Sequence, residues 1–442
     1  MRRIWLTAIV LASAATGCNE GLPPGAGDVP AVVDAATAPP EDLTPPPPPP
    51  PPDMLDNGAF SPNYPAPFPD PPQVISLGGP VLKAPRFVPV YFSNNDMQLM
   101  AQVTDFLNRV GATNFWKATT SEYGVGPATA TAPVFLAEQA TGTIPDSMIQ
   151  TWLLGKLNGN DPAWPAPDAN TIYSLHYPAA VTITIPAQGG GVSKSCNGFG
   201  AYHGNVTLDV NHKRLPVAYA VIPLCKSQGM TGVDAITAPE SHELVEAATD
   251  PYPNGRTAYA ETDEAHLYWA LTIGGGEVSD MCEANGSSYT KFQELPYAVQ
   301  RSWSNAAILA GHDPCVPAPS SPPYFTAVPR LEDPIPWGAG LQQIDMMGVV
   351  VPVGESRMIE LDLISDGDTG GPWTVSVRNQ RTGGGAQTGP LSFTLDRDSG
   401  RNGEKIHLTI TSVQATSTSI APFVITSQLG NTRHTWYGLV GQ

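Results

Sequence analysis

Hydrophobic positions in the middle of the chain follow two different spacings. Residues 86–92 form a short β-prone run, and residues 171–177 and 216–223 are apolar enough to be buried strands. Between these runs, over about 96–110 and 145–157, apolar residues return every three or four positions, which predicts helices. The expected core positions are Met97, Met100, Val103, Phe106 and Leu107 in the first helix and Met148, Trp152 and Leu153 in the second, with Thr143 or Asp146 as the cap of the second. We therefore predict a mixed α/β central domain.

The last third of the chain has a different pattern. After a Pro-rich junction at 316–323, apolar and polar residues alternate in five runs separated by Gly, Asp and Ser. These runs are 357–363, 373–377, 391–395, 405–410 and 423–427. The pattern predicts an all-β, immunoglobulin-like sandwich over 319–442, with Trp373 packed in its core. Its expected role is structural or surface attachment, and glycan binding is the alternative.

One helix carries the candidate chemistry. Residues 240–249 are good helix formers, and Pro251 cannot continue a helix, so the helix should end near Thr249. His242 and Glu246 then lie one turn apart on the same face, with Glu243 beside them. Leu244, Val245, Ala247 and Ala248 make this helix largely apolar, which predicts that it is packed. Carboxylates on a packed helix need a partner such as a cation.

Acidic residues are concentrated around this helix. From Glu240 to Glu283 there are ten Asp or Glu residues and a single basic residue, Arg256. Such a surplus requires either a bound metal or full exposure to solvent. The whole chain has a formal net charge of −18, which argues against nucleic acid as a partner.

Several ordered motifs between residues 73 and 318 carry a family resemblance. They are Ser-His-Glu-Leu-Val-Glu-Ala-Ala-Thr-Asp-Pro (241–251), Gly-Glu-Val-Ser-Asp-Met-Cys (276–282), Val-Gln-Arg-Ser-Trp-Ser-Asn-Ala (299–306), Cys-Asn-Gly-Phe-Gly-Ala-Tyr-His-Gly (196–204) and Val-Ala-Tyr-Ala-Val-Ile-Pro-Leu-Cys (217–225). This series resembles the bacterial relatives of the plant Exordium, or phosphate-induced, proteins. The resemblance implies a secreted, wall-associated protein, but no settled activity.

The N-terminal region predicts export. Residues 1–18 combine two arginines with an apolar run too short to span a bilayer, as in a lipoprotein signal peptide. The sequence Ala15-Thr16-Gly17-Cys18 resembles a lipobox, which predicts a lipid anchor at Cys18 as the only membrane contact. Ala15 stands where Leu is usual, so a secreted form without lipid stays open. Asn19 favours the outer membrane or the cell surface, and residues 19–72 are predicted to be a disordered, Pro-rich linker.

Four cysteines remain after Cys18: Cys196, Cys225, Cys282 and Cys315. In an exported chain an even number predicts two disulfides. Of the three possible pairings we favour Cys196 with Cys225 and Cys282 with Cys315, because the members of each pair are near in sequence and are flanked by the motifs of the resemblance. Zinc ligation by cysteine is the competing interpretation, but no Cys-x-x-Cys spacing supports it.

The predicted site is a zinc centre on the His-Glu-x-x-Glu helix. His242 and Glu246 would be two ligands, and Asp280 or Glu277 the third; we choose Asp280 narrowly. Glu243 would be the general base that accepts a proton from an activated water. His203 would stabilise an oxyanion or add a ligand, with a purely structural histidine as the alternative. The order of elements is compatible with a zincin-like domain.

These residues favour a zinc-dependent metallopeptidase acting on a peptide or protein. The competing hypothesis is a non-catalytic cell-surface protein that binds wall polysaccharide or a protein partner. In that case the acidic site would be structural or filled by calcium, a cation that exported proteins meet at high concentration.

Overall fold

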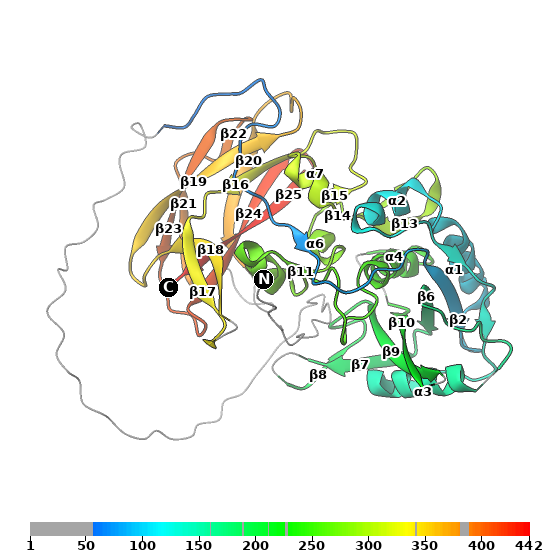
Figure 1. Ribbon diagram of the computed structural model, residues 1–442. Coiled ribbons are helices and arrows are strands. Elements are labelled where there is room, and N and C mark those ends of the chain that lie inside the picture. The colour runs from blue at the N-terminus through cyan, green and yellow to red at the C-terminus, as the bar shows by residue number, and fades with distance from the viewer. Residues whose placement is uncertain are drawn as a thin grey trace, which may run out of the picture.

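The computed structural model describes residues 56–159, 161–187, 190–210, 212–225, 229–340, 343–380 and 389–442 (Figure 1). The predicted signal peptide, the lipid anchor at Cys18 and most of the Pro-rich linker lie outside these residues. The described chain forms two lobes. One contains a mixed sheet with helices, and the other contains only packed sheets with short connections.

A mixed sheet organises the first lobe. Its strands are β2 (Arg86–Tyr91), β3 (Thr129–Ala130), β4 (Val134–Phe135), β6 (Thr171–Tyr177), β9 (Tyr202–Val210) and β10 (Lys213–Pro223). The order across the sheet is β3-β2-β6-β10-β9, and β4 also pairs with β2. All pairs are parallel except β10 with β9, so β9 is an antiparallel edge strand. The strands predicted at 86–92, 171–177 and 216–223 are thereby confirmed.

Helices cover both faces of this sheet. They are α1 (Met97–Val110), α2 (Asn114–Thr120), α3 (Asp146–Asn158) and α4 (Asp234–Thr249). Phe87 and Ile172 point into a core shared with α1 and α4, whereas Val88 and Tyr173 point into a core shared with α3. Side chains alternate across a strand, so neighbouring residues serve opposite cores. The near-continuous apolar strands follow from burial on both faces.

Two details of the predicted helices are wrong. Met97 and Met148 are exposed (44% and 59%), because the buried stripes of α1 and α3 run through Met100 and Ile149 instead. The α3 helix also has no side-chain cap. Asp146 is its first residue, and its Oδ1 accepts hydrogen bonds from the hydroxyl groups of Tyr202 and Tyr219.

Smaller elements complete the first lobe. They are the sheet of β5 (Gly142–Pro145), β7 (Val181–Pro186) and β8 (Val192–Lys194), the strand pairs β1 (Val74–Ile75) with β11 (Glu261–Thr262), β12 (Tyr289–Phe292) with β13 (Leu295–Gln300) and β14 (Ser302–Trp303) with β15 (Cys315–Val316), the helices α5 (Leu267–Ile273), α6 (Asp280–Glu283) and α7 (Asn305–Leu309), and single 3-10 turns at Ser121–Tyr123 and Glu264–His266. Disulfides join Cys196 to Cys225 and Cys282 to Cys315, as predicted.

The second lobe is a β-sandwich. Its strands are β16 (Phe325–Pro329), β17 (Asp333–Trp337), β18 (Ile344–Val350), β19 (Ser356–Ser365), β20 (Trp373–Asn379), β21 (Leu391–Leu395), β22 (Ser399–Gly400), β23 (Lys405–Ser412), β24 (Ile420–Leu429) and β25 (Thr432–Gly441). One sheet has the order β16-β19-β23-β21 and the other β17-β18-β25-β24-β20-β22. These orders fit the two sheets of an immunoglobulin-like sandwich. Trp373 is fully buried against Phe325 of the opposite sheet, as the alternation predicts.

The two lobes share one apolar core. Trp269 of α5 contacts Trp303 on its own side and Trp436 and Tyr437 of β25 on the other, with ring centroids 4.8–5.7 Å apart. The buried cluster is continuous from Phe87 to Val440. The predicted domain boundary near residue 319 therefore does not separate two independent hydrophobic cores.

Residues 56–72 differ from the predicted linker. The backbone amide of Lys405 donates to Asn57 O (2.7 Å), and that of Ser61 donates to Asn402 O (2.8 Å). Asn402 also accepts a hydrogen bond from the buried Ala66 amide at its side-chain oxygen. This segment belongs to the folded unit, because the sandwich supplies the hydrogen-bonding partners that a Pro-rich chain cannot supply itself.

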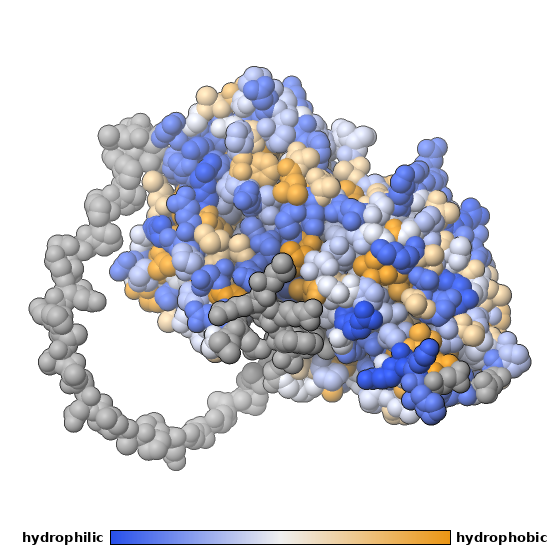
Figure 2. All heavy atoms as spheres, viewed as in Figure 1, coloured by the Kyte–Doolittle hydropathy of each residue, from blue (hydrophilic) through white to orange (hydrophobic). Residues whose placement is uncertain are grey.

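Apolar residues form only small groups on the face shown in Figure 2, separated by hydrophilic residues. Within the described residues, no helix is long and apolar enough to cross a bilayer.

Candidate metal centre

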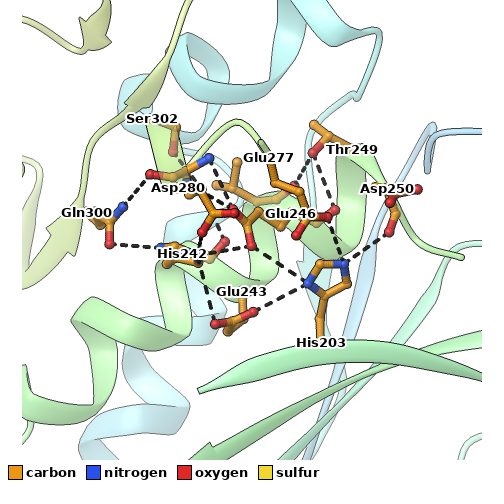
Figure 3. A network of polar contacts seen from close by, with 12 residues as sticks. His203, His242, Glu243, Glu246, Thr249, Asp250, Glu277, Asp280, Gln300 and Ser302 are labelled. Atoms are coloured by element: carbon orange, nitrogen blue, oxygen red, sulfur yellow. Dashed lines mark hydrogen bonds and ion pairs between the residues drawn. The ribbon is translucent and has the colours of Figure 1, made fainter. Parts of the chain in front are cut away.

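The helix α4 holds the candidate site inside the first lobe. Fourteen of its sixteen residues are buried, because it packs on β9 and β10 and against β13. It ends at Thr249, before Pro251, as predicted. Figure 3 shows its acidic and histidine side chains pointing toward residues 277–280 on one side and toward His203 on the other.

Three predicted ligands meet on one side of α4. His242 Nε2 lies 3.0 Å from Glu246 Oε2 and 3.4 Å from Asp280 Oδ1. The three residues are 6%, 1% and 3% exposed, and the three named atoms have no hydrogen-bonding partner outside the triad. Ligand atoms of this triad all lie within 4.8 Å of one another. One nitrogen and two carboxylate oxygens suit zinc, so the residues fit the predicted metal.

The orientation of His242 is fixed by a residue that the sequence analysis missed. Gln300, at the end of β13, has its Oε1 2.9 Å from His242 Nδ1, while its Nε2 donates to Ser279 O (2.7 Å). Because the NH2 group of the Gln300 side chain donates to Ser279 O, the side-chain oxygen must face His242. In its neutral form His242 therefore donates from Nδ1 and presents a lone pair at Nε2, as a metal ligand requires.

Glu246 is held by the start of α6. Its Oε1 accepts hydrogen bonds from the backbone amides of Ser279 (3.2 Å) and Asp280 (3.1 Å). Oε2 keeps no such donor and points into the site. Ser279 uses its hydroxyl to contact Ser302 Oγ (3.0 Å).

The other predicted residues lie on the second side of Glu246. His203 of β9 has Nδ1 3.4 Å from Glu243 Oε2 and 3.7 Å from Glu246 Oε2. Its Nε2 lies 3.2 Å from the carbonyl oxygen of Asp250 and 3.4 Å from Glu277 Oε1. Glu277 is thus placed beside His203, whereas Asp280 is placed beside His242. The two candidates for a third ligand occupy different sides of the site.

Burial makes two of these carboxylates, Glu246 and Glu277, hard to ionise. It raises the pKa of Glu246 to about 7, and neighbouring Asp280 adds to the effect. Burial and the nearby carboxylate of Glu246 raise the pKa of Glu277 well above its usual value. Burial lowers the pKa of His242, but the charges of Glu246 and Glu243 outweigh it, and the net pKa is raised. A bound cation would favour the ionised form of Glu246 and Glu277 and so oppose both the burial and the repulsion that raise their pKa values.

Basic residues do not compensate this charge. Across the described part of the chain, no Lys or Arg forms an ion pair with Glu243, Glu246, Asp250, Glu277 or Asp280. Among the described residues, the histidines His203 and His242 are the ion-pair partners of Glu243, Glu246, Glu277 and Asp280. The predicted alternative of full solvation also fails here, since each of these carboxylates is buried.

The remaining histidines lie elsewhere. His266 pairs with Asp263 (2.8 Å) and His312 with Asp366 (3.1 Å). His176, the next-to-last residue of β6, is buried with Nε2 2.9 Å from Glu240 Oε1. Glu240 and Asp250 were not predicted as site residues. Helical spacing could have indicated both, because Glu240 lies three residues before Glu243 and Asp250 lies four residues after Glu246.

Comparisons with known proteins add little to this geometry. No family model and no curated protein matches the chain. Among solved structures, domains 4 and 5 of the S-layer protein SbsC align at 16% identity and a TM-score of 0.16, covering 26% of this chain and 54% of that chain. The complex of titin M10 with an obscurin-like 1 immunoglobulin domain aligns at 17% identity and a TM-score of 0.16, covering 27% of this chain and 92% of that one. This chain spans about half the length of the SbsC fragment. TM-scores this low support no shared fold, so the sandwich assignment rests on strand order.

Proposed function

We propose that the protein is a zinc-dependent hydrolase that cleaves peptide bonds. One observation carries the proposal. Three buried atoms, His242 Nε2, Glu246 Oε2 and Asp280 Oδ1, converge without any hydrogen-bonding partner outside the cluster. Buried polar groups in native proteins are nearly always paired, so an unpaired cluster of metal-ligating atoms is best explained by an absent cation.

The arrangement of the first lobe supports a zincin-like assignment. Taking β3 and β4 together as the second strand, the strands of the mixed sheet follow the order 2-1-3-5-4, with antiparallel β9 at the edge. The helix α4 follows β10 and packs on β9 and β10. The metal helix and the edge strand would therefore border one substrate-binding face, where an extended peptide could align with β9.

Glu243 is the proposed general base. Its Oε1 lies 4.0 Å from His242 Nε2 and its Oε2 lies 3.4 Å from His203 Nδ1, so it borders the triad without belonging to it. The cation would polarise the substrate carbonyl and acidify a water molecule. Glu243 would accept the proton of that water and pass it to the leaving amine. His203, beside Glu243, would stabilise the oxyanion or add a ligand.

The resemblance to Exordium proteins and the predicted export are part of the proposed function. Two disulfides are typical of chains that mature in an oxidising compartment, which supports export. Lipid attachment at Cys18 remains part of the prediction. Radiolabelled palmitate incorporation in the wild type but not in Cys18→Ala would establish it, and secretion of an unlabelled protein would contradict it.

The test combines metal content with activity. We expect about one equivalent of zinc or more per chain in protein purified without chelator, with loss of this metal in His242→Ala and Glu246→Ala. Glu243→Gln should keep the metal but lower peptide hydrolysis about 100-fold or more, because only the base is removed. Glu264→Gln, at an exposed acid outside the site, is the matched control. Unchanged hydrolysis in Glu243→Gln would contradict the mechanism.

A second candidate is a non-catalytic, glycan-binding surface protein with a structural cation. The near-complete burial of Glu246 and Asp280 favours it, since a catalytic cation needs an open position for water. A groove of about 1410 Å³ beside the sandwich also favours it; Trp337, Phe393 and Asn379 are among its lining residues. Aromatic and amide side chains suit sugar rings. Retention on wall polysaccharide that Trp337→Ala abolishes, with no hydrolysis by zinc-loaded protein, would favour this candidate.

A further inference from the structure

Glu246 Oε2 lies between two histidines. It is 3.0 Å from His242 Nε2 on one side and 3.7 Å from His203 Nδ1 on the other (Figure 3). Its companion Oε1 already accepts two backbone hydrogen bonds. Glu246 Oε2 therefore borders two separate groups of potential metal ligands, one at His242 and one at His203.

The second set begins with His203. Its Nε2 faces the carbonyl oxygen of Asp250 at 3.2 Å, and a carbonyl only accepts, so the proton of a neutral ring belongs on Nε2. Nδ1 then presents a lone pair toward Glu243 Oε2 and Glu246 Oε2. Three acceptors facing one another repel, unless a cation or a proton lies between them.

Glu277 supplies an independent observation. Its side chain is 7% exposed, and Oε1, which lies 3.4 Å from His203 Nε2, forms no hydrogen bond. Glu277, His203 and Glu246 offer ligand atoms that all lie within 4.8 Å of one another. This is the same criterion that the His242 triad meets, and the two triads share only Glu246.

In their ionised form the buried carboxylates also favour more than one cation. A divalent ion in the His242 triad balances Glu246 and Asp280, which leaves Glu243, Asp250 and Glu277 buried without a Lys or Arg partner among the described residues. Hydrogen bonds from neutral donors reach only part of this set, since Asp250 Oδ2 is also unpaired. A second divalent ion would compensate the remaining charge.

We propose that His203, Glu277 and Glu246 form a second divalent-cation site, so that the centre holds two cations bridged by Glu246 Oε2. The donor set of one imidazole and two carboxylates suits Zn²⁺ or Mn²⁺. Two-metal hydrolytic centres hold their ions about 3.5–4 Å apart, a separation that one bridging carboxylate oxygen permits. This inference rests on the proposed function, because the first cation belongs to the His242 triad.

Metal stoichiometry tests the second site without reference to activity. Full-length protein would be saturated with Zn²⁺, freed of loose metal on a desalting column and analysed by mass spectrometry. We expect two Zn²⁺ per chain in the wild type and in Glu264→Gln, and one in Glu277→Gln. Asp280→Asn should lose the other ion and keep the one at His203.

Electron paramagnetic resonance of the Mn²⁺-loaded wild type gives a readout that needs no variant to fold. Two bridged ions should give an exchange-coupled spectrum, whereas one ion should give the six-line spectrum of isolated Mn²⁺. One Zn²⁺ per wild-type chain, lost in Asp280→Asn and kept in Glu277→Gln, together with an uncoupled spectrum, would overturn the second site and leave the first. Absence of bound metal from the wild type would overturn both.

Discussion

The imidazole of His242 and the side-chain amide of Gln300 are 2.9 Å apart, and both are buried. This contact decides which nitrogen of His242 faces the site, although 58 residues separate the two along the chain. The first prediction follows from it.

Replacing Gln300 with Leu should weaken zinc binding about 10- to 100-fold, because an outer partner that orients a histidine ligand contributes an effect of this size. Gln300→Glu keeps an acceptor for His242 Nδ1 and should bind more tightly than Gln300→Leu. Competition with a chromophoric chelator measures both. Equal affinities in the wild type and Gln300→Leu would show that this contact does not orient a metal ligand.

The two disulfides should stabilise the fold to similar extents but differ in their influence on the first metal triad. They close loops of similar sequence separation, 33 residues for Cys282–Cys315 and 29 for Cys196–Cys225, so loop-closure entropy predicts about 3–4 kcal/mol for each. Cys282 lies two residues after Asp280 in α6, and its removal should release that ligand.

Paired Cys→Ser variants test this prediction through urea unfolding and zinc affinity. The Cys282/Cys315 variant should lose both stability and zinc affinity at the His242 triad. The Cys196/Cys225 variant is the matched control, and it should lose stability while keeping zinc at that triad. Retained affinity in the first variant would show that α6 needs no disulfide to present Asp280.

His434 should make the sandwich sensitive to acid. It is buried between the rings of Tyr324 and Phe325, and burial lowers its pKa from 6.5 to about 4. Above pH 6.5 the ring is neutral in the folded and unfolded chains, and the stability is complete. As the pH falls from 6.5 to 4, only the unfolded chain binds the proton, so the free energy of unfolding decreases, by about 3 kcal/mol in total.

Urea unfolding at several pH values between 7.5 and 4 checks this slope. His434→Phe keeps an aromatic ring but cannot bind a proton, and its pH dependence should be flatter than that of the wild type. Parallel slopes in the two proteins would assign the acid sensitivity to other groups.

Trp269 should couple the two lobes. Its ring is 2% exposed and contacts Trp436 and Tyr437 across the junction. Trp269→Ala should lower the free energy of unfolding by about 3–5 kcal/mol, because it leaves a cavity in the shared core. It should also split a single calorimetric transition into two. Leu271→Ala, at an exposed position of the same helix, should change stability by less than about 0.5 kcal/mol.

Local pattern was enough to predict much of this protein. Continuous apolar runs identified strands of the first lobe and period-two alternation those of the second, helical spacing identified α1 and α3, and Pro251 marked the end of α4. The spacing of His242 and Glu246 placed both on one face, because a helix brings residues four apart together. The disulfide pairing was also predicted correctly, since each pair is close in sequence.

Only the tertiary structure decided how the distant pieces meet. No local pattern shows that β13 brings Gln300 to His242, or that Asp280 and Glu277 lie on opposite sides of Glu246. The sequence likewise could not show that residues 56–72 pack on the sandwich, or that the lobes share one core. Spacing along the chain determines which side chains share a face, whereas contacts between faces depend on how whole elements pack to bury apolar surface.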